Sequence, residues 1–364
     1  MKNKYNTLKI SMIAIILGFI LGFIIVIITG RSPYNMLIAL IRSISGFDLS
    51  KPENGFNLIF LYNWLLDCMP IILTGLSVGF AYRTGLFNIG GEGQFMLGST
   101  FSAFAAIYLE LPLIIHLPIC ILAGALGGAL WSFLPGFLKA YKNINEVVVC
   151  IMLNYIGLYF SNFLVQNFLP LDAFTLARSI PFNTSAILPK LPTGTSSALN
   201  YGIIVVIIAL LIYWFIIEKT TFGFSLKATG SNINSAKFAG MKVKRNTVYS
   251  MMIAGALSGL AGAIVVCGVF KHGRIFTLFD NYGFDGIAVA LVGAANSFGI
   301  LLSGLLFGLL KACGNAFQLF NIPKEISSLI QASIIYLVAI QYGIIWIINK
   351  KDKLKLKNKE SNNE

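Results

Sequence analysis

The sequence predicts an all-α membrane protein, a polytopic bundle of about ten transmembrane helices with broken or re-entrant segments. Hydrophobic residues make up 57% of the 364 residues and charged residues 11%. A soluble domain averages about 25% charged residues. The apolar residues also gather in runs of about 20, the length that crosses a hydrocarbon core of roughly 30 Å. This composition leaves too little polar surface for a cytosolic enzyme, a disordered regulator or a secreted disulfide scaffold.

The first expected span runs from Leu8 to Thr29. Lysines precede it, as in a signal peptide, but the apolar stretch exceeds the usual 7 to 15 residues or so and no A-x-A site follows. We therefore expect a retained helix. The other spans are expected at residues 57–81, 87–109, 112–138, 146–168, 201–217, 249–270, 284–297, 299–320 and 327–348.

Two stretches are expected to be broken or re-entrant. Residues 284–297 are too few to cross as a straight helix, and glycines interrupt residues 84–98. Such backbone is tolerated at membrane depth only where protein or a wet cavity satisfies its polar groups. GxxxG pairs, which let helices approach closely, predict a tight bundle. They begin at Gly18, Gly75, Gly124, Gly255 and Gly304.

The basic residues predict the orientation. With both termini in the cytoplasm, cytoplasmic segments hold 18 Lys and Arg and outer loops hold 8, as the positive-inside rule requires. The net charge of +13 therefore reports topology and not a nucleic-acid ligand. We expect a transmembrane domain over residues 1–349, with a cytoplasmic loop at about 218–248, and a basic cytoplasmic tail over residues 350–364.

Motifs of soluble chemistry are missing. No Gly-Lys dipeptide occurs, so there is no Walker A loop. The two histidines form no HExxH, and the five cysteines lie singly in apolar runs without a CxxC. We expect no catalytic residues, no metal site and no cofactor, and we interpret the cysteines as small core residues.

Polar residues at membrane depth are the stronger signal, because a buried charge costs at least about 2.5 to 3.5 kcal/mol on insertion scales. They could staple helices together or line a path for a solute. Several of them cluster in the broken segments at residues 85–94 and 145–155, which favours the path. The predicted path residues are Asn88, Glu92, Gln94, Glu146, Asn154 and Asp285.

The cytoplasmic loop carries a third signal. Ala236, Phe238, Ala239 and Met241 would give a short helix an apolar side, and Gly240 is a suitable C-terminal stop. A helix of this kind outside the membrane needs a partner to cover it. The alternative is a solvated, positively charged loop.

Four blocks carry a family resemblance: GLFNIGGEGQFMLG at residues 85–98, NEVVVCIMLNYI at 145–156, residues 227–262, and YGFDGIAVALVG at 282–293. With these blocks the chain resembles the inner-membrane permease subunits of bacterial ABC importers in the branched-chain amino-acid and simple-sugar permease family. The nucleoside and simple-sugar permeases are the most similar subgroup. Residues 232–236 lack the acidic pattern common in that family's cytoplasmic loop, which puts an acidic contact to the ATPase in doubt.

The resemblance implies nucleoside import across the bacterial cytoplasmic (inner) membrane. A substrate-binding lipoprotein would deliver the solute to two paired permeases, this chain with a related second permease or with itself. Separate ATPase subunits would bind ATP and dock under residues 231–242. The residues implied in this coupling are Asn234, Ala236, Lys237, Ala239 and Gly240.

Two other transport functions stay open. The chain could import a simple sugar such as ribose or galactose, or it could be an autonomous ion-coupled transporter that uses Asp67, Asp285 and Lys311. The sequence holds no nucleophile-base or metal constellation, which argues against a membrane enzyme that acts on lipid.

Overall fold

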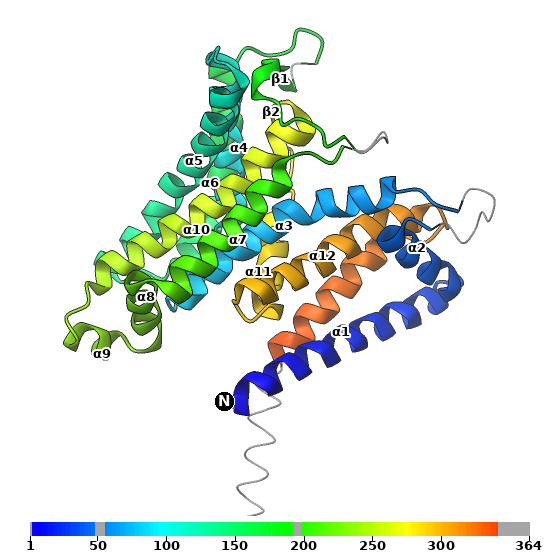
Figure 1. Ribbon diagram of the computed structural model, residues 1–364, viewed down its shortest axis with the longest axis horizontal. Helices are drawn as coiled ribbons and strands as arrows, with labels where there is room; N and C mark the ends of the chain where they lie inside the picture. Colours follow the sequence, from blue (N-terminus) through cyan, green and yellow to red (C-terminus); the bar gives the residue numbers. More distant parts are fainter. Residues whose placement is uncertain (1, 48–54, 176, 193–197, 341–364) are drawn as a thin grey trace, which may run out of the picture. The chain divides into compact units, whose positions relative to one another are not determined.

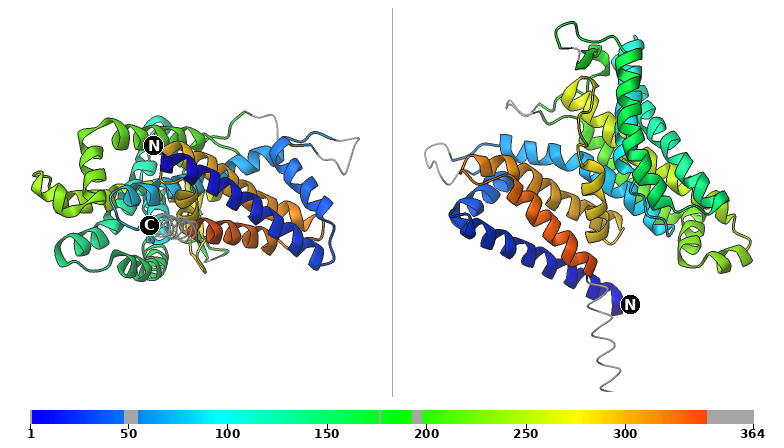
Figure 2. Two further views of the ribbon diagram at one scale, coloured as in Figure 1. Left: turned by 90° about the horizontal axis from the view of Figure 1, so that it is seen from below. Right: turned by 180° about the vertical axis from the view of Figure 1, so that it is seen from behind.

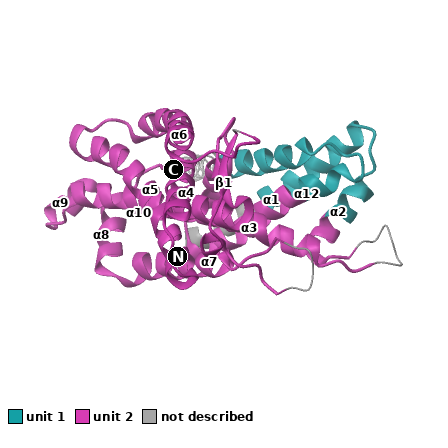
Figure 3. Ribbon diagram, turned by 90° about the horizontal axis from the view of Figure 1, so that it is seen from above, with its two compact units in different colours: residues 1–39, 313–364 teal, residues 40–312 magenta. Residues whose placement is uncertain are grey.

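The computed structural model describes residues 2–47, 55–175, 177–192 and 198–340, with side chains from residue 12 onward (Figure 1). The chain forms two compact units (Figure 3): residues 1–39 with 313–364, and residues 40–312. The expected tail at residues 350–364 lies outside the described residues, as do residues 341–348 of the last expected span.

The first unit contains α1 (Lys2–Ile28), the start of α2 (Pro33–Ser45) and an apolar helix over Glu325–Ile340. Gly18 and Gly22 of α1 face Ile334 and Ile330 of that last helix, and a Cβ at either glycine would collide with the isoleucine side chain. The GxxxG pair therefore serves helix packing, as predicted.

The second unit holds most of the chain. Besides the end of α2, its helices are α3 (Ile59–Arg83), α4 (Gly91–Tyr108), α5 (Leu113–Lys142), α6 (Glu146–Phe168), α7 (Gly202–Lys219), α8 (Thr221–Ser231), α9 (Ile233–Phe238), α10 (Val243–Val265), α11 (Tyr282–Val292) and, as far as Ala312, α12 (Ser297–Gln318). A π-helical turn, η3 (Val266–Phe270), continues α10, and a short 3-10 turn, η2, covers Thr184–Ala186. α10 packs against α3, α4 and α5 and so forms the centre of this unit.

Glycines set the closest helix contacts in that centre. A Cβ at Gly128 of α5 would collide with the carbonyl oxygen of Gly255 on α10, and one at Gly259 would collide with that of Gly124. Two GxxxG pairs thus meet face to face, because only glycine lets these backbones touch. This packing confirms the predicted tight bundle.

The helices make this a multi-pass membrane protein. Within the described residues six helices are long and apolar enough to cross a bilayer, and shorter apolar helices cover Met12–Ile28, Tyr282–Val292 and Glu325–Ile340. α4 occupies the expected span at residues 87–109 but begins only at Gly91. The expected span at 284–297 is shorter still, because α11 ends at Val292 and Ala294 and Ala295 adopt positive φ before α12 begins.

Two elements were absent from the sequence prediction. α2 lies where a loop was expected, between the first two spans. A two-stranded antiparallel sheet pairs β1 (Arg178–Pro181) with β2 (His272–Arg274), a small departure from an all-α fold. In Figure 1 and in the right-hand view of Figure 2, this sheet lies at one end of the helices of the second unit, and α8 and α9 lie at the other.

Candidate functional site

The break between α3 and α4 is held by buried amides. Asn88 donates to the Ser77 hydroxyl at 3.1 Å and exchanges two hydrogen bonds of 2.9 Å with the Gln94 amide. Its side-chain oxygen also accepts the N–H of Gly90 at 3.1 Å. Neither amide is exposed beyond 1%. The paired side chains therefore replace the hydrogen bonds that the interrupted helix lacks.

Asn154 of α6 fastens the same segment from the other side. It accepts the N–H of Gly93 at 2.8 Å and donates to the carbonyl oxygen of Ile89 at 3.0 Å. It is 2% exposed. Because one side chain satisfies a backbone donor and a backbone acceptor, α6 fixes where the chain re-enters helical structure.

Glu92 joins the two broken segments. One carboxylate oxygen accepts the N–H of Asn281 at 2.8 Å and the other accepts that of Gly283 at 2.7 Å, at the first turn of α11. The carboxylate is fully buried. A carboxylate at a helix N-terminus satisfies free N–H groups and complements the helix dipole. A Cβ on Gly283 would lie 2.6 Å from the carbonyl carbon of Gly91, so only glycine permits this approach.

The structure thus brings together four of the six predicted path residues, Asn88, Glu92, Gln94 and Asn154, and shows what they bind here: the backbone of the broken segments and each other. The fifth, Glu146, lies apart from them. It forms an ion pair of 2.8 Å with Lys139 at the start of α6.

The sixth, Asp285, belongs to a half-buried charged cluster. The Lys311 ammonium lies 3.5 Å from the Asp285 carboxylate and 3.6 Å from the centroid of the Tyr282 ring. Asp67 of α3 is half-buried and within electrostatic range of Lys311. The Lys311 and Asp285 side chains keep 29% and 20% of their surface exposed. Unlike the buried amides, these groups have hydrogen-bonding capacity left for a polar solute.

Sequence reasoning missed how this cluster is assembled. Asp285 was predicted as a path residue, whereas Asp67 and Lys311 were noted as charged residues at membrane depth and given a role in the ion-coupled alternative. Their signal was available, because an ionisable residue inside an apolar helix is a functional candidate by default. Their proximity was not, because α3, α11 and α12 lie far apart along the chain.

The cytoplasmic loop forms the expected short helix. The Asn232 side chain caps α9 by accepting the N–H of Ser235 at 3.1 Å. Gly240, with φ of +77°, ends it, and the N–H of Met241 bonds back to the carbonyl of Ala236 at 3.0 Å. This stop confirms the role predicted for Gly240 as a helix terminator.

The expected apolar side of α9 is split between two directions. Ala236 is buried and seats the helix, whereas Phe238 is 94% exposed and Ile233 is 58% exposed. Asn234, Lys237, Ala239 and Gly240 are also exposed. Phe238 and Ile233 therefore form an exposed apolar face on α9 that a partner protein or lipid could cover.

This loop contacts the break between α3 and α4. Gly230 of α8 packs on Gly85, where an added Cβ would lie 3.0 Å from the Gly230 Cα. Ser250 of α10 donates to the Thr84 hydroxyl at 2.7 Å. Both contacts attach α8 and α10 to the segment that holds the buried amides.

An ion-pair network ties the same helix ends. Glu218, near the end of α7, accepts from Arg83 of α3 and, at 3.0 Å, from Lys227 of α8. Side chains of this network are about a third exposed. Each pair therefore contributes little stability by itself, but the network fixes the relative position of three helix ends.

Among the described residues no group of three His, Cys, Asp or Glu side chains could hold a metal ion. The five cysteines are all free and buried, as their interpretation as core residues predicted.

The chain matches a family model described as the branched-chain amino-acid transport system permease component over residues 60–339. It is 38% identical over 355 residues to a guanosine ABC transporter permease protein of Bacillus subtilis, covering 97% of this chain and 99% of that relative. It is 35% identical to a nucleoside ABC transporter permease protein of Lactococcus lactis, covering 98% and 97%. A glucose ABC transporter permease protein of Haloferax volcanii is 32% identical, covering 74% and 73%. No solved structure matches the chain.

Proposed function

Since the chain belongs to the branched-chain amino-acid transport permease family, we propose that it is the membrane-spanning subunit of an ABC importer that takes up nucleosides. One observation carries the substrate class: 38% and 35% identity to a guanosine and a nucleoside permease over 97% and 98% of the chain. The match to the glucose permease spans only 74% of it. The nucleoside function is therefore favoured over the sugar and ion-coupled alternatives.

The proposal includes its assembly. ABC permeases work with ATPase subunits, which would supply all ATP binding, so this chain would need no cofactor. A binding lipoprotein would deliver the nucleoside, and a second related permease or a second copy would complete the path in the bacterial cytoplasmic membrane. We propose ten helices over residues 1–349, both termini in the cytoplasm, the loop at about 218–248 facing the ATPase, and a basic tail at 350–364.

Within the path, the charged cluster has the chemistry to bind a nucleoside. The carboxylates of Asp67 and Asp285 can accept hydrogen bonds from ribose hydroxyls, and the ammonium of Lys311 can donate one. Tyr282 adds an aromatic face beside them. Asn88, Glu92, Gln94, Glu146 and Asn154 would shape the same path by holding the broken segments in register.

Coupling would run through the contacts that join the loop to the break. ATPase subunits would bind the exposed side of α9, where Phe238 is flanked by Asn234, Lys237, Ala239 and Gly240. The buried Ala236 would pack α9 against the rest of the chain. A movement of α8 and α10 would reach residues 84–90 through Gly85 and Thr84. Glu92 would pass it to α11 and so to Asp285. An ATPase that binds one arrangement more tightly than another shifts the population accordingly.

The test is nucleoside uptake in cells that express the full transporter with Phe238→Ala in this chain. We expect uptake to fall at least tenfold while membrane insertion and thermal stability stay unchanged, because Phe238 makes no core contact. The matched control is Phe224→Ala on α8, also exposed, at 63%.

Two further arms separate the alternatives. Excess ribose should fail to compete with labelled guanosine, and proteoliposomes should import only when ATPase subunits and ATP are present. Normal uptake with Phe238→Ala would refute the docking assignment. Uptake driven by an ion gradient without the ATPase would refute the function itself.

A further inference from the structure

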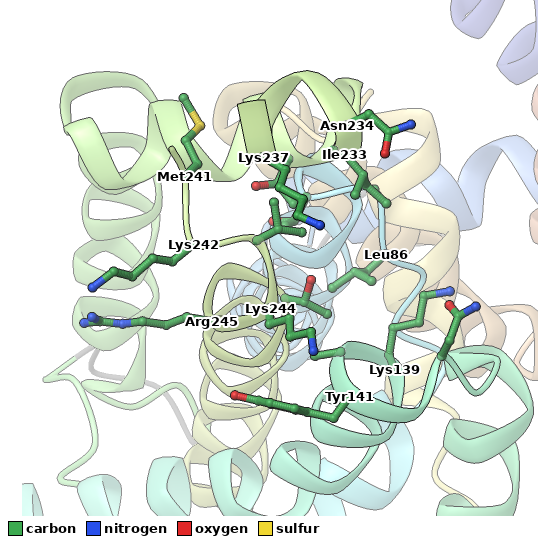
Figure 4. A pocket seen from close by; sticks show the side chains of 18 residues that line it. Leu86, Lys139, Tyr141, Ile233, Asn234, Lys237, Met241, Lys242, Lys244 and Arg245 are labelled. Atoms are coloured by element: carbon green, nitrogen blue, oxygen red, sulfur yellow. The ribbon is translucent and has the colours of Figure 1, made fainter. Parts of the chain in front are cut away.

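A cavity of about 710 Å³ lies beneath α9, between the end of α5 and the start of α10 (Figure 4). Its walls include apolar groups, among them Leu86, Met241 and Tyr141. Its charged lining residues are all cations: Lys139, Lys237, Lys242, Lys244 and Arg245. No aspartate or glutamate lines it.

Only one of these charges is neutralised within the described residues. Lys139 pairs with Glu146 at 2.8 Å. Lys244 lies 5.1 Å from the ring centroid of Tyr141, and Arg245 lies 4.9 Å from that of Tyr249. An aromatic ring attracts a cation but leaves its full charge in place. Lys244, Arg245, Lys237 and Lys242 take part in none of the described ion pairs.

The side chains place this charge in the cavity and beside it. In Figure 4, the Lys237 side chain extends from α9 toward the cavity, and the Lys244 side chain, on α10, lies on the opposite side of the cavity. Lys242 and Arg245 extend together toward one side. Lys237 and Lys244 at the cavity, with Lys242 and Arg245 beside it, raise the local concentration of anions there, since a low-dielectric wall focuses the field.

The location favours an amphiphilic anion. α5 ends at Lys142 and α10 begins at Val243, so the cavity lies where helices of the bundle leave their apolar stretches. Tyr141 and the lysines around it are the residue types that occur at a membrane interface. The anionic lipids of the cytoplasmic leaflet attract such basic groups, and basic pockets between helices hold their headgroups.

We propose that this cavity binds a phosphate-bearing anion through Lys237, Lys244 and their neighbouring cations, with an anionic phospholipid of the cytoplasmic leaflet as the source that the mixed apolar and basic lining fits. Apolar groups such as Leu86 and Met241 would contact the glycerol and upper acyl carbons, and the lysines would hold the phosphate. An occupied site would brace α9 against α5 and α10. The inference concerns binding alone and goes beyond the proposed import function.

The test uses the full chain, purified with its partner subunits in a neutral detergent and stripped of lipid. Dihexanoyl phosphatidylglycerol, dihexanoyl phosphatidylcholine and inorganic phosphate are titrated separately. Thermal stability and native mass spectrometry report binding. We expect phosphatidylglycerol to stabilise and to be retained, phosphatidylcholine to do neither, and Lys244→Gln to weaken the retention about fivefold, as expected for one lysine near an anionic surface.

The matched control is Lys219→Gln. Lys219 is an exposed lysine on the same side of the second unit, 5.3 Å from the ring centroid of Trp214, but it does not line the cavity. It should leave the titration unchanged, and Lys244→Arg should keep most of the binding.

Each outcome decides the proposal. A response to inorganic phosphate that equals the response to phosphatidylglycerol supports the anion site and assigns it to a soluble phosphate. Equal responses to both lipids, or equal effects of Lys244→Gln and Lys219→Gln, overturn it. So does phosphatidylglycerol binding that appears only after the ATPase is removed, because the cations then serve acidic groups of that protein. Transport is not the readout, so failure here leaves the import function untouched.

Discussion

Replacing Glu92 by glutamine should loosen the junction between α4 and α11. The carboxylate is fully buried, and its two oxygens accept the N–H groups of Asn281 and Gly283 at 2.8 and 2.7 Å. Glutamine keeps one acceptor and turns an amide donor toward the other N–H. Leaving one buried donor unpaired costs about 1–3 kcal/mol. Glu92→Ala leaves both unpaired and should cost about 2–6 kcal/mol, since alanine offers no acceptor.

The measurement is unfolding of the purified protein in mixed micelles, followed by uptake of labelled guanosine. We expect the loss of stability to rise stepwise from wild type to glutamine to alanine, and uptake to fall with it, because α11 carries Asp285. Glu110→Gln is the matched control, since Glu110 is exposed in the loop after α4 and its change should stay within about 0.5 kcal/mol. If Glu92→Gln unfolds like wild type, the carboxylate does not hold α11 and the reasoning fails.

Three further predictions follow from packing and charge. Gly128→Ala should destabilise the protein by about 1–3 kcal/mol, because its Cβ meets the rigid carbonyl of Gly255. Gly304→Ala, whose closest contact is the side chain of Ile72, should cost less in the same thermal melt. Glu218→Gln should cost less than about 1 kcal/mol, and the difference from wild type should vanish in high salt. The pKa of Asp172, in the loop before β1, lies below its ordinary value of 3.8, chiefly because the carboxylate accepts the backbone N–H of Phe174. The ionised Asp172 therefore stabilises that loop above about pH 4, and this effect disappears as the pH falls through the lower folded-state pKa. Hydrogen exchange of the loop should show this pH dependence in wild type and lose it in Asp172→Asn.

Local chemistry explains why much of the fold could be predicted. Runs of apolar residues, glycines at 85–93 and the Gly240 stop each act within a few residues, so the membrane class, the break before α4 and the short helix α9 all follow from the sequence. α2 was missed because its 13 residues mix polar and apolar groups and fall below the length of a span. The β1–β2 pair was missed because each strand is only three or four residues long.

The sequence by itself determined that this protein lies in a membrane, and it determined where the helices break. Both follow from the hydrophobicity and backbone freedom of individual residues. The tertiary structure alone decided which polar groups meet. Glu92 accepts the N–H of Asn281, 189 residues later, at the start of α11, and Lys311 joins Asp285 and Tyr282 only because α11 and α12 fold back on each other. A buried charge requires a partner, but its own sequence neighbourhood does not specify which distant residue packing will bring to it.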